Sequence, residues 1–174
     1  MKAYHTCSDK GGLGDVLQKA PFLSRNTDQT WLTQGYYFWT DSPYFAYQWG
    51  EDAYNNQYFI FEYILNFTEN KRYLDLTSIM GQLYFDDIKS KIKFKGEINY
   101  TVNGVISFLR DKTNKMEKLF PFIAIKAKDA KCKNKILFVR GKKETLSILE
   151  RHQICVFKEA KDIITFTRIE HPHQ

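Results

Sequence analysis

The sequence predicts a single α+β domain, residues 1–174, built around a mixed or antiparallel β-sheet with a few flanking helices. A chain of 174 residues is long enough for one domain with its own core. About seven short segments are rich in β-branched and aromatic residues, and few helical patterns separate the later ones. The hydrophobic share of 43% and the net charge of only +6 exclude a disordered chain.

The first expected elements are a short strand and a short helix. The strand is placed at Ala3–Cys7. The glycine-rich run at 11–14 marks a turn, and the helix at 15–20 ends at Pro21, which cannot continue it. This turn lacks the spacing and the Lys-Ser/Thr pair of a phosphate-binding loop, so it does not predict a nucleotide loop.

A second strand and helix follow. Gly35–Trp39 is β-prone and aromatic. The sequence Asp41-Ser42-Pro43 supplies an N-cap and a proline for the first turn, so we expect a helix from about Tyr44 to Glu51.

The strongest strand pattern of the chain covers Tyr58–Leu65. Residues 79–109 favour helix, although three glycines leave its boundaries open. The remaining strands are expected at residues 73–76, 120–127, 136–139, 153–157 and 163–167.

Charge is divided unevenly along the chain. Residues 1–87 hold 6 basic and 11 acidic side chains, whereas residues 88–174 hold 20 basic and 9 acidic ones. A basic stripe beside aromatic residues indicates nucleic-acid binding, but a solvated lysine-rich surface has the same composition. Most of these charges belong to lysine, and arginine is the residue better suited to bidentate phosphate contacts.

Cysteine usage and hydropathy favour a cytoplasmic protein. Cys7, Cys132 and Cys155 have neither a paired spacing nor a zinc-ligand spacing, which fits a reducing compartment and predicts no metal site. No stretch approaches the ~18 apolar residues of a membrane span, and the N-terminus lacks the apolar run of a secretion signal.

Three segments carry the residue types of a candidate site. They are Tyr4-His5-Thr6, the run from Trp31 to Trp39 that contains Gly-Tyr-Tyr-Phe, and Arg151–Val156. Aromatic residues make up 16% of the chain, more than a core of this size needs, which favours a cleft lined by rings.

Taken in this order, the three segments resemble the ADP-ribosyltransferase superfamily, in its diphtheria-toxin and poly-ADP-ribose-polymerase branch. That branch is marked by a His, a Tyr and a Glu on three separate strands. The resemblance covers the chain from Tyr4 to Val156. It implies a split β-sheet and NAD as co-substrate without a metal, and the short chain is similar to small bacterial toxin-type members.

The resemblance implies three catalytic residues. His5 matches the histidine that holds the adenine-side ribose of NAD, and Tyr37 matches the tyrosine that packs against nicotinamide. Gln153 stands where the family has its catalytic Glu.

The resemblance also implies further contacts with NAD. Thr6 stands where the family has a Gly whose main-chain N–H and C=O grip the nicotinamide amide. Tyr47 or Trp49, from the following helix, is expected on the other face of nicotinamide. Tyr36 lies beside the motif tyrosine, and the position and charge of Arg25 place it near the pyrophosphate.

Gln153 is the main departure from the family pattern. An amide hydrogen-bonds a ribose hydroxyl but carries no charge and is not a general base. In the family, loss of the Glu accompanies transfer of one ADP-ribose rather than a polymer, and in some members loss of activity. Glu150 and Glu159 are the alternative carboxylates.

These implications predict a mono-ADP-ribosyltransferase toxin of the bacterial cytoplasm, an enzyme of the glycosyltransferase class. A toxin–antitoxin or phage-defence system, with an antitoxin protein as partner, is the expected setting, and a type VI effector is the other. The basic second half slightly favours nucleic acid, such as RNA, over protein as acceptor. The alternatives are a non-catalytic module that binds NAD or ADP-ribose, and a basic nucleic-acid-binding domain without NAD chemistry.

Overall fold

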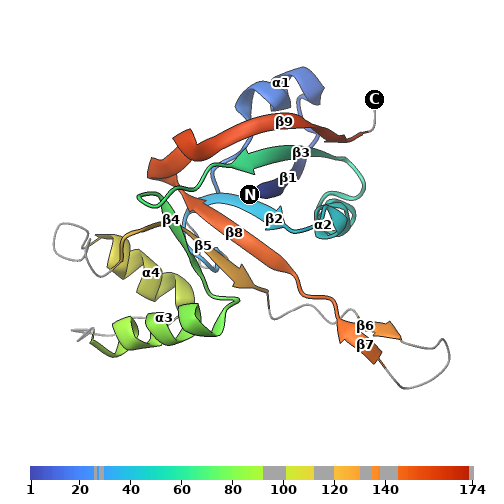
Figure 1. Cartoon of the computed structure of the whole chain (residues 1–174). Coiled ribbons are helices and arrows are strands. Elements are labelled where there is room, and N and C mark those ends of the chain that lie inside the picture. The colour runs from blue at the N-terminus through green and yellow to red at the C-terminus, as the bar shows by residue number, and fades with distance from the viewer. Residues whose placement is uncertain are drawn as a thin grey trace.

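The chain folds around a β-sheet of seven strands in the order β4-β5-β8-β2-β1-β3-β9 (Figure 1). The structure is a computed structural model and describes residues 1–25, 27, 30–91, 101–111, 120–129, 135–137 and 145–172. The strands of the sheet are β1 (Lys2–Ser8), β2 (Gly35–Thr40), β3 (Tyr58–Leu65), β4 (Arg72–Asp75), β5 (Phe122–Lys128), β8 (His152–Phe157) and β9 (Ile164–His171). The helices are α1 (Gly12–Lys19), α2 (Tyr44–Tyr54), α3 (Ile79–Lys91), α4 (Val102–Asp111) and the 3₁₀ helix η1 (Lys158–Ile163).

The sheet is mixed, which confirms the predicted α+β class. β4 and β5 run parallel, and the other neighbouring pairs run antiparallel. The strand predicted at Tyr58–Leu65 has the same bounds in the structure, and the other predicted strands of this sheet differ at their ends by a few residues.

Two elements were not predicted from the sequence. β7 (Thr145–Ile148) pairs with β6 (Lys135–Leu137) in a separate two-stranded sheet that projects from the body in Figure 1. A segment of four residues is too short to show the alternation of apolar and polar side chains that identifies a strand in a sequence. Its strand conformation depends on pairing with the neighbouring strand. The other is η1, which continues directly from β8. The last two residues of the strand predicted at 136–139 lie outside the described residues.

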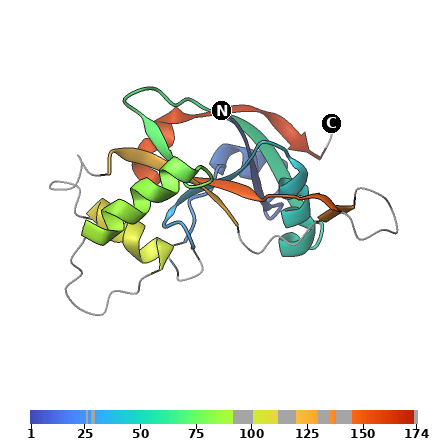
Figure 2. The ribbon, with the colours of Figure 1, turned by 60° about the horizontal axis from the view of Figure 1, so that its bottom comes forward.

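The helices cover both faces of the sheet, as Figure 2 shows with α3 and α4 in front of it and α1 behind. Successive residues of a strand point to opposite faces, so β8 contributes to two cores. Ile154 and Val156 pack in the core on the α1 side, which contains Val16. Cys155 packs on the opposite side, in the core that contains Leu109 of α4.

β1 and β2 separate soon after they meet, and this opening positions the candidate site. β1 pairs with β3 at seven successive positions, but with β2 only at Ala3–Thr40 and Tyr4–Trp39. Beyond Tyr4, the start of β2 pairs with β8 on its other side. The remaining half of β1 therefore faces a gap in the sheet.

Among the described residues, no helix is long and apolar enough to cross a lipid bilayer. Cys7 and Cys155 are buried free thiols, and Cys132 lies outside the described residues.

Replacing Gly35 with alanine should destabilise the fold. A Cβ atom at this position would lie 2.4 Å from the Cys155 Sγ and 2.5 Å from the carbonyl oxygen of Val156. We expect Gly35→Ala to lower the free energy of unfolding by about 1–3 kcal/mol, the usual effect of overpacking.

Gly14→Ala is the matched control, because a Cβ there meets no atom within 4 Å and the residue lies inside α1. Alanine favours helix over glycine by about 1 kcal/mol, so this variant should be neutral or more stable. Urea denaturation of both variants measures the difference. Equal stability would contradict the tight packing of β2 against β8.

Candidate functional site

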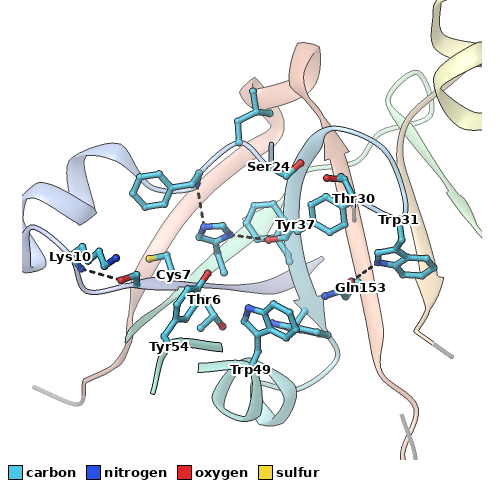
Figure 3. A pocket seen from close by; sticks show the side chains of 16 residues that line it. Thr6, Cys7, Lys10, Ser24, Thr30, Trp31, Tyr37, Trp49, Tyr54 and Gln153 are labelled. Carbon is cyan, nitrogen blue, oxygen red and sulfur yellow. Dashed lines mark hydrogen bonds between the residues drawn. The ribbon is translucent and has the colours of Figure 1, made fainter. Parts of the chain in front are cut away.

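A cavity of about 560 Å³ occupies the opening between β1 and β2 (Figure 3). Its volume falls in the range of roughly 300–1,000 Å³ that is usual for small-molecule sites. All three segments selected from the sequence contribute to its wall. The candidate residues that line it are His5, Thr6, Tyr37, Trp49 and Gln153.

His5 joins three parts of the chain across the opening. The backbone N–H of Phe22 donates to its Nε2 over 3.2 Å, so this nitrogen is the acceptor and Nδ1 carries the proton. Nδ1 then donates to the carbonyl oxygen of Tyr37 over 2.9 Å. Burial lowers the pKa of His5 to about 4, although the bond to the Tyr37 carbonyl favours the protonated ring. The ring is therefore neutral near pH 7.

Thr6 offers main-chain groups to the opening. Met1 and Leu65 exchange both backbone hydrogen bonds, and the Asp9 N–H donates to the Gln57 carbonyl, so the odd-numbered residues of β1 bond to β3. In a central antiparallel strand the alternate residues turn their N–H and C=O to the other neighbour. The N–H and C=O of Thr6 thus point to the side where β2 has diverged.

The Thr6 side chain is occupied elsewhere. Its hydroxyl donates to the carbonyl of Ala46 in α2 over 3.0 Å. This bond ties the helix that carries Trp49 to the strand that carries His5.

Tyr37 combines a ring at the cavity wall with a hydroxyl that anchors the preceding segment. The Leu32 N–H donates to the Tyr37 hydroxyl over 3.1 Å, and this hydroxyl donates to the Thr33 carbonyl over 2.8 Å. Burial raises the pKa of Tyr37, so the phenol stays neutral. Its hydroxyl is an anchor for residues 32 and 33.

Of the two aromatic candidates on α2, Trp49 lines the cavity. Its indole lies 6.0 Å from the Trp39 ring and is 40% exposed. Tyr47 instead donates from its hydroxyl to the Glu170 carbonyl over 3.3 Å and has its ring 5.6 Å from that of His171. Trp49 is therefore the α2 candidate that the structure brings to the cavity.

Gln153 lies at the cavity wall with its amide oxygen already bonded. The indole N–H of Trp31 donates to its Oε1 over 2.9 Å (Figure 3). The amide nitrogen has no hydrogen-bond partner among the described residues.

Tyr36 and Arg25 do not line the cavity. Tyr36 is buried in the core on the α1 side, because it alternates with Tyr37 along β2. Arg25 is exposed, and its carbonyl accepts from the Thr30 hydroxyl over 2.6 Å.

Neither alternative carboxylate lies at the cavity. Glu150 accepts from the Lys128 ammonium and lies 3.0 Å from Nε2 of His152, on the opposite face from Gln153. These bonds lower its pKa. Glu159 lies at the other end of β8, where both of its oxygens accept from Arg110 at 2.8 and 2.9 Å.

Lys10 and Trp31 are two of the cavity residues to which the sequence analysis gave no role. Lys10 is the one basic side chain besides His5 among the described lining residues, and no Asp or Glu is found there. The sequence feature that could have identified Lys10 is its position just after the strand that carries His5. Trp31 belongs to the aromatic motif, but only the folded chain brings it to Gln153, 122 residues away.

The described part of the chain contains no group of three or more His, Cys, Asp or Glu side chains with the geometry of a metal site. Cys7 lines the cavity, but burial raises its pKa to about 12 and keeps the thiol protonated. A protonated thiol is a poor nucleophile. The described groups that line the cavity are aromatic rings, hydroxyls, main-chain groups, the Gln153 amide, the His5 ring and the Lys10 ammonium.

No protein-family model, curated protein sequence or solved structure matches this chain. The roles of the cavity residues are therefore inferred from their own contacts and chemistry.

The stability of the protein should fall at acid pH because of His5. The folded state keeps the ring neutral down to about pH 4, whereas the unfolded chain binds a proton below about pH 6.5. Lowering the pH from about 6.5 to about 4 therefore decreases the free energy of unfolding, by about 3 kcal/mol in total. Urea denaturation at several pH values should show a smaller loss for His5→Asn. An identical pH dependence in both proteins would contradict a buried neutral His5.

Tyr37→Phe should also destabilise the protein. It leaves the Leu32 N–H and the Thr33 carbonyl without the phenol, which costs about 1–3 kcal/mol. Tyr36→Phe is the control, since that hydroxyl has no hydrogen bond among the described residues. Chemical denaturation measures both. A loss of equal size in the two variants would show that the Tyr37 hydroxyl is not an anchor.

Proposed function

We propose that the cavity binds NAD and that the protein transfers ADP-ribose from it to a macromolecular acceptor. One observation supports this most directly. Residues from three separate segments, which resemble the motifs of the ADP-ribosyltransferase superfamily, line one cavity at an opening of the sheet.

The chemistry of the wall fits an anionic dinucleotide. Rings of Tyr37 and Trp49 offer faces to a planar, positively charged nicotinamide by stacking and cation–π attraction. The main-chain N–H and C=O of Thr6 complement a carboxamide. Lys10, rather than the exposed Arg25, is the cation available to a pyrophosphate.

When bound, NAD supplies a ribose carbon that becomes electrophilic as its bond to nicotinamide breaks. The electron pair of that bond leaves with nicotinamide. The acceptor then bonds to the ribose carbon and gives up a proton. The described lining residues include no carboxylate to take that proton, and the Nε2 lone pair of His5 is already occupied. The proton therefore leaves to solvent. Positioning by the aromatic faces and Thr6 supplies the rate enhancement.

The basic second half favours nucleic acid, such as RNA, as the acceptor. Residues 88–174 carry a net charge of +11, and the two-stranded sheet of β6 and β7 immediately precedes β8, which carries Gln153. Lysine-rich segments bind phosphate backbones through salt-dependent contacts. The resemblance to small bacterial toxin-type members supports a toxin–antitoxin or phage-defence system as the setting of this activity.

A second candidate is a module that binds NAD or ADP-ribose without cleaving it. The neutral amide of Gln153 favours this candidate, because no described lining residue provides a negative charge that would stabilise the ribose cation. The two candidates predict the same binding and differ in the release of free nicotinamide.

Binding is tested with Trp49→Ala and a control on the same helix. We expect Trp49→Ala to weaken NAD binding, measured by calorimetry, by about 1–3 kcal/mol, the usual contribution of one stacked ring. Tyr44→Ala removes a ring of similar exposure, 47%, that does not line the cavity, and it should leave the affinity unchanged. If Trp49→Ala binds NAD with unchanged affinity, NAD does not bind in this cavity.

Transfer is tested by incubating the protein with labelled NAD and a cell lysate and dividing the sample between nuclease and protease. Label lost to nuclease supports a nucleic-acid acceptor, and label lost only to protease indicates a protein acceptor. NAD binding with neither label nor free nicotinamide would leave the binding module as the function.

A further inference from the structure

The orientation of the Gln153 amide is fixed by Trp31. The indole N–H is a donor only, and the sole acceptor of a glutamine side chain is its Oε1. The 2.9 Å bond between them therefore turns the NH₂ group away from Trp31. Figure 3 shows this nitrogen end directed to the side of Trp49, inside the cavity.

Trp31 is itself held in place by its neighbours. The next two residues are anchored by the Tyr37 hydroxyl, and the Leu32 side chain is fully buried. On the other side, the Thr30 hydroxyl donates to the Arg25 carbonyl. The backbone on either side of Trp31 is thus anchored, and with the indole N–H in this place rotation of the Gln153 amide would set an N–H against an N–H.

We propose that Trp31 is a positioning residue that makes Gln153 present an N–H donor to the ligand and thereby restrains cleavage of the bound dinucleotide. This inference rests on the proposed function. Cleavage develops positive charge on the ribose, and the positive end of an N–H dipole disfavours that charge. An acceptor oxygen at the same place favours it.

Three variants separate the parts of this arrangement. Gln153→Glu keeps an acceptor for the Trp31 N–H and places a carboxylate oxygen toward the cavity. Trp31→Phe removes the donor, so the amide is free to present its oxygen. Gln153→Leu removes both the acceptor and the cavity donor and is the matched control.

The first readout does not depend on activity. The chain has three Trp, so a ¹⁵N NMR spectrum contains three indole signals, and the one missing in Trp31→Phe belongs to Trp31. This signal should move upfield in Gln153→Leu and remain downfield in Gln153→Glu. A Trp31 signal that is unchanged in Gln153→Leu would overturn the proposed bond.

The second readout is the release of free nicotinamide at saturating NAD, with affinity measured in parallel. We expect release to be at least about tenfold faster in Gln153→Glu and a few-fold faster in Trp31→Phe. Gln153→Leu, which loses the N–H but gains no acceptor, should release nicotinamide faster than the unmodified protein and more slowly than Gln153→Glu. Unchanged or slower release in both Gln153→Glu and Trp31→Phe, with NAD still bound, would overturn the restraint and leave the proposed binding intact. Absence of NAD binding in the unmodified protein would overturn the proposed function and the restraint together.

Discussion

The neutral ring of His5 joins the strands on either side of the opening in the sheet, and the geometry of the cavity depends on it. β1 and β2 share only two paired positions, so the edges of the gap need another connection. His5 supplies it by donating to the Tyr37 carbonyl and accepting from the Phe22 N–H. Because both ring nitrogens are engaged, a donor on any ligand would reach Nε2 only by replacing the Phe22 N–H.

Tyr37 connects this support to the chemistry of the cavity. Its carbonyl accepts from His5, and its hydroxyl anchors the segment that carries Trp31. Trp31 in turn orients Gln153. Rings, main-chain groups and an amide donor therefore line the cavity in which we propose that an anionic dinucleotide binds.

A cluster of charged side chains near Gln153 lies on the other face of the sheet. His152 has its Nδ1 3.0 Å from Asp41 and its Nε2 3.0 Å from Glu150, and the Lys126 ammonium lies 3.3 Å from Asp41. Burial alone would raise the pKa of Asp41, but the bond from His152 and the charge of Lys126 lower it. Strand alternation places this cluster away from the cavity, so Glu150 does not substitute for a carboxylate at Gln153.

The sequence by itself determined the α+β class, the main strands and the motif residues, because alternation, turn residues and residue types are local properties. It also determined that His152 and Gln153 face opposite sides. Only the tertiary structure decided that Trp49 rather than Tyr47 lines the cavity, that Lys10 lines it and Arg25 does not, and that Trp31 meets Gln153. These outcomes depend on how helices and loops pack across the gap in the sheet, and contacts between residues more than a hundred positions apart leave no local pattern.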